Sequence, residues 1–314
     1  TYNERYGYWI NLQYEDCIGY GDVAPLEGFN IESLEDSYYA LQGFNHALSG
    51  EDYDQEDIFS LIEVHTQNTS SARFGLETAF YDLFSKLANT SVAKFLNKKN
   101  KSKILINGIA GVHSADDGFQ IIKVKVGYNN IFDEIDNMEN LIQLYGKNVQ
   151  FRLDLNQSLD LPRAIRYCKE MERFNIDYIE QPILSSNLED LSELRYHTSI
   201  PIAVDESLTD YESVEKIIDM QAADIFVIKP MVSGGFNECK KIIQLIRSEK
   251  FKPIITTSLE SYIGHFACLH LCSANNITDA CGLATGDLLI ENHPQIKIKN
   301  GIASIALKPG LGLD

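Results

Sequence analysis

The sequence predicts an α/β fold in which a barrel of parallel strands follows a separate α+β module. Five short apolar runs between residues 121 and 229 each carry charged residues at their C-terminal ends. The charges that end successive runs lie 24 to 29 residues apart, which is about the length of one strand, one helix and their two loops. The first hundred residues lack this repeat. The change in rhythm therefore predicts two parts of different architecture.

The charged residues at the strand ends form an ordered set. In chain order they are Lys123 with Lys125, Asp154, Glu180, Asp205 and Lys229. The carboxyl ends of parallel barrel strands meet at one face, which is where barrel enzymes place their active sites. Lys123 and Lys125 are two residues apart on a strand, so their side chains project on the same side. We therefore expect one site, with three carboxylates between lysines.

The first module is expected to combine a hairpin with helices. Residues 6–24 alternate in strand fashion around a turn near Glu15-Asp16. Helical periodicity then covers residues 32–48, 55–64 and 72–88. Between hairpin and helices, residues 24–30 are rich in turn formers, and we expect two large side chains of this loop, Leu26 and Phe29, to be exposed.

The barrel elements follow from residue 104. Strand one is expected at 104–108, strand seven at 253–257 and strand eight near 281–283. Helices are expected near 131–145, 160–173, 187–196, 211–220 and 235–248. Only about a dozen residues, 109–120, separate strands one and two, so the first crossover helix must be very short or absent. Near the end of the chain, Asn300-Gly301 between alternating segments predicts a β-hairpin.

Composition excludes some classes of partner. The formal net charge of −18 opposes binding to nucleic acid and to anionic membranes, because the overall field repels polyanions. A small anionic substrate remains compatible, since local lysines and a metal can override that field. Six scattered cysteines without a repeated spacing favour a reducing compartment, and we expect a cytoplasmic protein. We expect neither a signal peptide nor a membrane span, because the sequence shows no apolar run long enough to cross a bilayer.

The chemistry of the charged set indicates a divalent cation. Three carboxylates are hard oxygen ligands that suit Mg²⁺, with Mn²⁺ as an alternative. A lysine close to other cations has a lowered proton affinity and can act as a base near neutral pH. A small substrate carboxylate on the metal would then lose its neighbouring carbon-bound proton to a lysine. The alternative is that these charges only cap strands or pair with one another, which would not require six of them at matched positions.

Five motifs around these residues resemble the muconate-lactonizing branch of the enolase superfamily. They are Lys123-x-Lys125, Arg152-Leu153-Asp154-Leu155-Asn156, Ile179-Glu180-Gln181-Pro182, Asp205-Glu206-Ser207 and Val227-Ile228-Lys229-Pro230. Three further stretches are most similar to the o-succinylbenzoate synthases, enzymes of menaquinone biosynthesis. These are residues 19–29, Ser258-Leu259-Glu260-Ser261 and Gly282-Leu283-Ala284-Thr285. The resemblance extends over nearly the whole chain.

The resemblance implies a modified (β/α)7β barrel of the TIM type over residues 103–285. Residues 1–100 would form an α+β capping domain, completed by the tail at 286–314. The chain begins at Thr1 without a Met, which leaves open whether a first strand of the cap precedes it. The implied activity is a lyase reaction, the dehydration of 2-succinyl-6-hydroxy-2,4-cyclohexadiene-1-carboxylate to 2-succinylbenzoate.

The resemblance also implies roles for single residues. Lys125 would be the acid-base group, Lys229 the opposing cation, and Lys123 would lower the proton affinity of Lys125. The metal ligands would be Asp154, Glu180 and Asp205, with Mg²⁺ as the cofactor. The residues expected to contact substrate are Leu26, Phe29, Asn156, Gly234, Ser258 and Ser261.

Three other functions remain open at this point. The nearest is a racemase or epimerase of N-acylamino acids or dipeptides, in which Lys125 and Lys229 serve as two opposed bases. The second is a non-catalytic metal-binding barrel, which would have no use for both the carboxylates and the lysines. The third is a Schiff-base aldolase, which would not need three carboxylates on adjacent strands. The oligomeric state cannot be inferred from the sequence.

Overall fold

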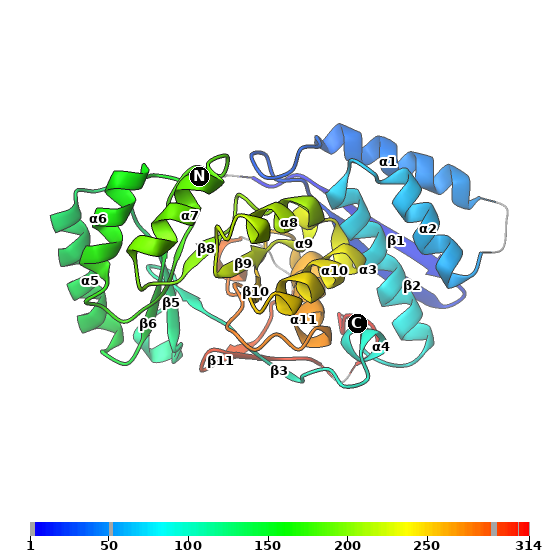
Figure 1. Ribbon diagram of the computed structural model, residues 1–314. Helices are drawn as coiled ribbons and strands as arrows, with labels where there is room; N and C mark the ends of the chain where they lie inside the picture. The colour runs from blue at the N-terminus through cyan, green and yellow to red at the C-terminus, as the bar shows by residue number, and fades with distance from the viewer. Residues whose placement is uncertain (1–3, 50–52, 290–293, 307, 314) are drawn as a thin grey trace.

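A computed structural model describes residues 4–49, 53–289, 294–306 and 308–313. In Figure 1 the barrel helices α5, α6 and α7 lie at one end of the molecule, and the cap helices α1 and α2 lie at the opposite end. Helices α9, α10 and α11 lie between them, next to the long cap helix α3. The molecule is therefore an α/β barrel with an α+β cap, as the sequence predicts.

The barrel wall is a seven-stranded sheet with the order β10-β9-β8-β7-β6-β5-β4, in which every neighbouring pair is parallel. Its strands are β4 (Gly108–Ile109), β5 (Ile121–Lys125), β6 (Gln150–Asp154), β7 (Ile176–Glu180), β8 (Ile202–Val204), β9 (Ile225–Ile228) and β10 (Lys252–Ile255). Sequence order is kept from strand to strand, so the carboxyl ends of β5 to β9 follow one another around a single face of the barrel.

The barrel closes through a very short eighth segment. Cys281 forms a parallel bridge with Ile106, and Gly282 forms one with Thr256 next to β10. The expected eighth strand is thus reduced to two bridges. The expectation of one continuous first strand over 104–108 is wrong, because β3 (Lys103–Leu105) belongs to another sheet and only β4 joins the barrel. The chain changes sheets at Ile106, whose N–H donates to Gly301 O.

Helices cover the outside of the barrel between successive strands. They are α5 (Ile131–Tyr145), α6 (Leu161–Met171), α7 (Leu188–His197), α8 (Tyr211–Asp219), α9 (Pro230–Ser233), α10 (Gly235–Ser248) and α11 (Tyr262–Ala274). The first crossover contains only a 3-10 turn, Ala115–Asp117, which confirms that its helix is lost. Several helices begin at a side chain that accepts from a backbone N–H, such as Asn130 for α5 and Asp160 for α6.

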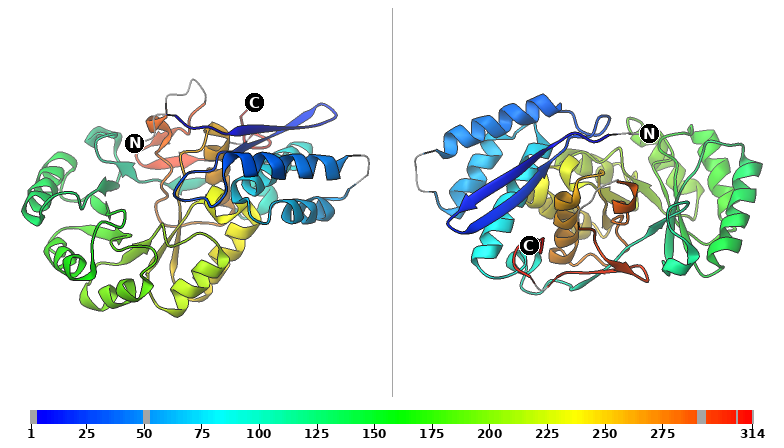
Figure 2. Two further views of the ribbon diagram at one scale, coloured as in Figure 1. Left: turned by 90° about the horizontal axis from the view of Figure 1, so that it is seen from above. Right: turned by 180° about the vertical axis from the view of Figure 1, so that it is seen from behind.

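The cap consists of a hairpin and four helices. Strands β1 (Tyr8–Tyr14) and β2 (Cys17–Val23) pair antiparallel. The helices are α1 (Leu34–Leu48), α2 (Gln55–His65), α3 (Ser70–Leu87) and α4 (Val92–Leu96). The view from behind in Figure 2 shows the hairpin running along the outside of the cap helices. Helix α1 begins with a capping box between Ser33 and Asp36.

Helix α3 lies between the hairpin and the barrel, and most of its residues are buried. Towards the hairpin, a side chain at Gly21 would collide with the backbone carbonyl of Gly75, so two glycines allow the strand to approach the helix. Towards the barrel, the Phe74 and Phe236 rings stack with centroids 6.2 Å apart. The backbone N–H of Asn237 donates to Glu77 Oε2 at 3.0 Å. Phe74 and Tyr81 of α3 thus belong to the apolar core of the barrel, while Leu76 and Phe80 of the same helix belong to a separate cluster within the cap.

The tail contacts both parts of the molecule. Strands β11 (Ile298–Lys299) and β12 (Ile302–Ser304) form the hairpin predicted around Asn300-Gly301, and β12 pairs with β3. Further on, Leu311 N–H donates to Asp82 Oδ1 of helix α3 at 2.7 Å.

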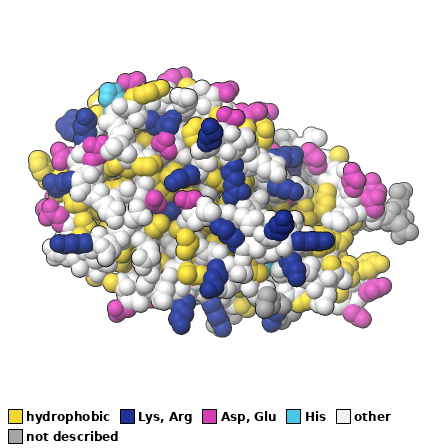
Figure 3. Space-filling view, turned by 60° about the horizontal axis from the view of Figure 1, so that its bottom comes forward, with side chains coloured by type: hydrophobic (Ala, Val, Ile, Leu, Met, Phe, Trp, Pro, Cys, Tyr) yellow, Lys and Arg dark blue, Asp and Glu magenta, His cyan; other side chains and the backbone are white. Residues whose placement is uncertain are grey.

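Charge is distributed unevenly over the surface. Lysine and arginine side chains gather on the face that Figure 3 turns forward, although the chain as a whole is strongly acidic. Within the described ranges, no helix combines the length and the apolar character needed to cross a membrane.

Candidate active site

The candidate site forms because alternate residues of the barrel strands point inward. The buried cluster of Tyr178, Ala203, Ile225, Val227 and Ile254 occupies the barrel interior, whereas their neighbours in sequence pack against the helices. Continuing this alternation by two residues from Tyr178, Ala203 and Val227 reaches Glu180, Asp205 and Lys229. The predicted charges therefore continue the inward-facing set at the carboxyl end of the barrel.

Strand register places these charges side by side. In the strand register, Lys125 of β5 lies opposite Asp154 of β6, and Asp154 lies opposite Glu180 of β7. Asp205 directly follows β8 and Lys229 directly follows β9. In sheet order the carboxylates lie on β6, β7 and β8, with Lys125 on one side and Lys229 on the other.

Lys123 bridges two of the carboxylates. Its Nζ lies 2.9 Å from Asp154 Oδ2 and 2.8 Å from Glu180 Oε1. Burial opposes the charge on Lys123, but the two carboxylates more than offset it and hold the pKa of Lys123 well above its ordinary value. Lys123 therefore stays protonated, and it acts in this site as a fixed cation rather than as a base.

Lys229 lies between a carboxylate and an aromatic ring. Its Nζ forms a close ion pair with Asp205 Oδ1. The same atom lies 3.9 Å from the centroid of the Phe29 ring, a cation–π contact. This contact brings the cap loop at residues 26–30 directly over the barrel lysine. The expectation that both apolar side chains of this loop are exposed is wrong, because Leu26 is only 4% exposed and Phe29 is half-buried where its ring meets Lys229.

The carboxylates fit a divalent cation by their chemistry and burial. Asp154, Glu180 and Asp205 are each at most 5% exposed, and Glu180 Oε2 has no hydrogen-bond partner. Burial raises the pKa of Glu180 to about 8, and the neighbouring Asp154 and Asp205 charges add to the rise that Lys123 opposes. Three carboxylates carry one more negative charge than Lys123 and Lys229 balance, and Glu180 Oε2 still lacks a donor, so a divalent cation would supply the missing positive charge.

The lysines determine how the carboxylates are held. No group of three or more His, Cys, Asp or Glu side chains in the described ranges is gathered as closely as a metal site requires. Lys123 hydrogen-bonds to Asp154 and Glu180, and Lys229 pairs with Asp205. Ammonium groups therefore satisfy these oxygens in the described arrangement.

Gln181 is a supporting residue whose role was not predicted from the sequence. It is fully buried and has a positive φ of 37°. Its Oε1 accepts from the backbone N–H groups of Asp205 and Ser207, at 3.0 and 3.1 Å. Its Nε2 donates to Ile183 O at 3.0 Å. Gln181 thus fixes the backbone of Asp205, and its place in the Glu-Gln-Pro motif was the available sign of this role.

Arg152 supports the site from below. It is 1% exposed, and its Nη1 donates to Asn107 Oδ1 at 3.0 Å and to Ala280 O at 2.7 Å. Its Nε pairs with Asp177 at 2.8 Å. Arg152 therefore connects β6 to the two segments that close the barrel, near Asn107 and Ala280. It lies two residues before Asp154 on the same face of β6.

Asn156 lies beside the carboxylates, where substrate contact was expected. Its N–H donates to Asp154 Oδ1 at 3.2 Å, and its Nδ2 donates to Glu206 Oε1 at 3.1 Å. Asn156 Oδ1 and Glu206 Oε2 are buried without a hydrogen-bond partner. Burial, followed by the charge of Asp205, raises the pKa of Glu206.

Of the other residues expected to contact substrate, Ser258 and Ser261 form hydrogen bonds within the protein, whereas Gly234 lines a cleft. The Ser258 hydroxyl donates to Glu260 Oε1 at 2.8 Å and is 2% exposed. Ser261 N–H donates to Asp22 Oδ2 at 2.7 Å, and its Oγ accepts from Trp9 Nε1 at 3.2 Å. Ser258 therefore holds the loop after β10 together, and Ser261 connects this loop to the cap hairpin. Gly234 has a positive φ of 96° and lines a cleft beneath the cap loop.

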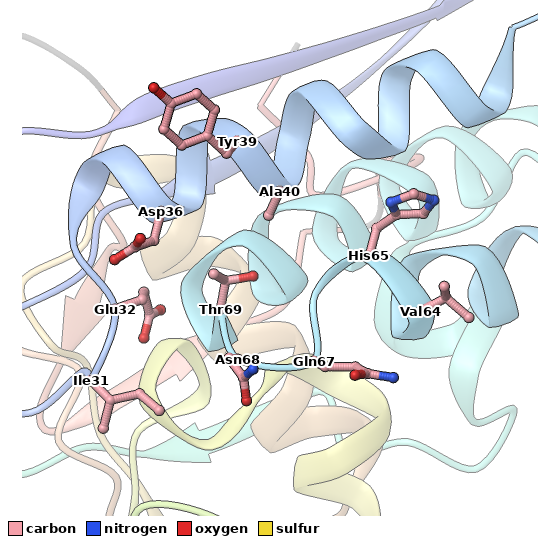
Figure 4. A pocket seen from close by; sticks show the side chains of 10 residues that line it. All are labelled: Ile31, Glu32, Asp36, Tyr39, Ala40, Val64, His65, Gln67, Asn68 and Thr69. Carbon is pink, nitrogen blue, oxygen red and sulfur yellow. The ribbon is translucent and has the colours of Figure 1, made fainter.

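A hollow of about 630 Å³ lies in the cap away from these residues. Figure 4 shows its lining side chains on α1, on the end of α2 and on the loops around them, with His65 near one end and Asp36 near the other. The carboxylate of Glu32, which also lines it, accepts from Ser71 N–H at 2.7 Å. None of the predicted site residues lines this hollow.

Comparison with known proteins identifies the family. The family model described as "Enolase C-terminal domain-like" matches residues 110–314. The chain belongs to the enolase superfamily. Among the structures, the dipeptide epimerase from Enterococcus faecalis V583 superposes with a TM-score of 0.86 at 22% identity, covering 97% of this chain and 93% of that one. The muconate lactonizing enzyme from Pseudomonas putida gives a TM-score of 0.85 at 23% identity, covering 97% of this chain and 90% of that chain.

Relatives with curated activities correct the expected reaction. An L-Ala-D/L-Glu epimerase of Francisella tularensis subsp. novicida is 28% identical over 306 residues, covering 90% of this chain and 86% of its own. An o-succinylbenzoate synthase of Bacillus subtilis is 26% identical over 253 residues, covering 77% of this chain and 68% of its own. The expectation of an o-succinylbenzoate synthase is therefore wrong, because epimerases match more strongly. The motifs misled because both reactions begin with loss of a proton next to a carboxylate.

Proposed function

We propose that the protein is an epimerase that inverts an α-carbon in a dipeptide or a related N-acylamino acid. One lysine removes the α-proton from one face of the carbon, and the opposed lysine delivers a proton to the other face. The observation that carries the proposal is the order of the strands. Lys125 and Lys229 lie on β5 and directly after β9, and all three carboxylates lie on the strands between them.

The donor set supports Mg²⁺ as the cofactor, held by Asp154, Glu180 and Asp205. When bound, it would supply positive charge beside the substrate carboxylate. Lys123 contributes a permanent positive charge two residues from Lys125 on the same face of β5. Phe29 covers Lys229 and shields its proton from bulk water.

The relatives support this class of reaction. The Francisella enzyme is named for L-Ala-D/L-Glu, and a Bacillus cereus relative, 22% identical over 315 residues, is named N-succinyl-L-Arg/Lys racemase. A structure from Cytophaga hutchinsonii is described as a dipeptide epimerase complexed with Mg and D-Ala-L-Val. Both groups of substrates carry a carboxylate next to the inverted carbon and an acylated nitrogen on it.

Deuterium exchange tests the proposal directly. The protein is incubated with Mg²⁺ in D₂O with L,L- and L,D-dipeptides and with N-succinylamino acids, and loss of the α-proton signal is followed by NMR. We expect exchange and inversion with at least one substrate. Lys125→Ala and Lys229→Ala should each abolish inversion, and each should retain exchange of the epimer whose proton faces the remaining lysine. Loss of a general base lowers such rates by about 10²- to 10⁴-fold.

Lys252→Ala is the matched control, because Lys252 is a largely exposed lysine at the start of β10, remote from the carboxyl ends of the strands. It should behave as wild type. The absence of exchange with every substrate would refute the proposal. Complete loss of exchange for both epimers in one lysine variant, with both retained in the other, would instead show a one-base reaction.

A further inference from the structure

A second cleft opens between the cap and the barrel next to Lys229. It holds about 170 Å³ and is lined from the cap by residues 29–31, 66–68, 70 and 73, and from the barrel by residues around Asp210 and Gly234. At about 30 Å³ per water-sized group, this volume admits about five or six non-hydrogen atoms. It therefore suits a short arm of a substrate rather than a whole one.

Arg73 gives this cleft a positive charge with an unused donor. Its Nε donates to Thr66 Oγ1 and its Nη2 to Thr66 O, both at 3.1 Å, which fixes the plane of the guanidinium. Its Nη1 has no hydrogen-bond partner in the ranges that the structure describes. A Cβ built on Gly234 would lie 3.8 Å from this Nη1 and 3.5 Å from Glu238 Cβ, so the lack of a side chain at Gly234 leaves this edge of the guanidinium uncovered on that side.

Ser233 supplies a second donor from the barrel side. It is 2% exposed and lines the cleft, and its hydroxyl has no hydrogen-bond partner. A buried hydroxyl without a partner is unfavourable, because it has lost its hydrogen bonds to water without replacing them. A ligand oxygen that accepts from both groups would remove that penalty.

Two carboxylates also line the cleft, but each has a partner elsewhere. Asp210 caps helix α8, where it accepts from Ser213 N–H at 2.7 Å. Glu238 pairs with Lys241 at 3.1 Å. Among the described charged side chains that line the cleft, Arg73 therefore keeps a hydrogen-bonding group without a protein partner, whereas Asp210 and Glu238 each have one.

The cleft is continuous with the reaction centre. Ser233 lies one helical turn after Lys229, and its N–H donates to Lys229 O at 2.8 Å. Phe29 lines the cleft and also contacts Lys229 Nζ through its ring. A group attached to the carbon that faces Lys229 can therefore enter the cleft beside Phe29.

We propose that this cleft binds a second carboxylate of the substrate, carried on the side chain of the inverted residue, with Arg73 Nη1 and Ser233 Oγ as donors. A carboxylate on two methylene groups has five non-hydrogen atoms, which the cleft admits. The preferred substrate is then an N-acylated acidic amino acid such as an Xaa-Glu dipeptide. This inference rests on the proposed function.

The test compares two dipeptides of equal shape, L-Ala-L-Glu and L-Ala-L-Gln, in the deuterium-exchange assay with Mg²⁺. We expect wild type to prefer L-Ala-L-Glu in kcat/KM. Arg73→Gln should lower kcat/KM for L-Ala-L-Glu by about 10- to 100-fold, the usual effect of losing a charged hydrogen bond. It should lower kcat/KM for L-Ala-L-Gln much less, because an uncharged amide oxygen forms a weaker bond with the guanidinium. Ser233→Ala, which leaves the Arg73–Thr66 bonds intact, should act in the same direction by about tenfold or less.

Arg173→Gln controls for the loss of one positive charge, since Arg173 is half-exposed and pairs with Glu139 on the outside of the barrel. It should keep the wild-type preference. Exchange of both dipeptides without preference, or an equal loss for both in the Arg73 and Ser233 variants, would overturn the cleft assignment and leave the epimerase standing. Exchange of neither dipeptide while other dipeptides react would overturn it as well, and exchange of no substrate would overturn both.

Discussion

Lys123 Nζ lies within 3 Å of both Asp154 Oδ2 and Glu180 Oε1, so one ammonium group holds two of the three buried carboxylates. Removing this cation would leave two negative charges side by side in a poorly hydrated site. Breaking a buried pair in this way typically lowers the free energy of unfolding by about 3–5 kcal/mol.

Lys123→Met should therefore lower Tm strongly in EDTA. Adding Mg²⁺ should then raise the Tm of the variant by more than it raises the Tm of wild type. The reason is that the cation replaces the missing positive charge. Thermal unfolding with and without Mg²⁺ measures this, with Lys252→Met as the control. A deficit that Mg²⁺ leaves unchanged would contradict the assignment of these carboxylates to a metal.

Glu180→Gln should fold but lose its stabilisation by Mg²⁺. Glu180 is 1% exposed, and an amide keeps its shape while removing the charge that a cation needs. Titration of Mn²⁺ followed by electron paramagnetic resonance measures the affinity without reference to activity. Glu189→Gln, on the exposed first turn of α7, serves as control. Wild-type Mn²⁺ affinity in the Glu180 variant would argue against its role as a ligand.

Phe29→Ala should weaken turnover of substrate and leave Mn²⁺ affinity unchanged. The ring contacts Lys229 and closes the site from the cap side, so its loss admits water to the lysine. We expect kcat/KM to fall by about tenfold, since a cation–π contact and its apolar area amount to about 1–2 kcal/mol. Phe132→Ala, an exposed aromatic on α5, is the control. An unchanged kcat/KM would count against a lid at this loop.

Glu77 predicts a pH dependence of stability. Burial raises its pKa to about 7 from an ordinary value of 4.5. Between these values the folded state holds one more proton than the unfolded state. The stabilisation is therefore fully present below about pH 4.5 and is lost as the pH rises through about 7, to the extent of about 3 kcal/mol.

Glu77→Gln should flatten this dependence, because the amide keeps the hydrogen bond from Asn237 without titrating. Urea unfolding at about pH 5 and about pH 8 measures the difference in the free energy of unfolding. Glu139→Gln, at an exposed position, should retain the wild-type slope. A wild-type slope in the Glu77 variant would mean that other groups dominate.

Much of the barrel site could be predicted because it depends on local pattern. A residue two positions beyond an inward apolar residue also points inward, so Glu180, Asp205 and Lys229 could be assigned to one face without coordinates. The loss of the first crossover helix followed from chain length alone. These residues indicated loss of a proton next to a carboxylate, the step that the expected and the proposed reactions share, but they did not indicate the choice between elimination and inversion.

The remaining features depend on contacts between distant segments. The burial of Leu26 and the contact of Phe29 with Lys229 are set by how the cap loop meets the barrel, 200 residues away in sequence. The split of the first strand at Ile106 depends on pairing with the tail near Gly301. No local periodicity carries either fact. The accessibility of Arg73 Nη1 likewise depends on the fold, because the barrel residue that lies beside it, Gly234, has no side chain to cover it.

The position of α3 limits how the active site can open. Phe74 stacks on Phe236, Tyr81 Oη donates to Asn237 Oδ1 at 2.6 Å, and Glu77 holds the start of α10 from the same helix. A rotation of the whole cap would have to expose this shared apolar seam and break all of these contacts at once. In the proposed enzyme, substrate would therefore enter past the segments at 24–31 and 66–70, with the body of the cap as a fixed wall of the barrel rather than a hinged domain.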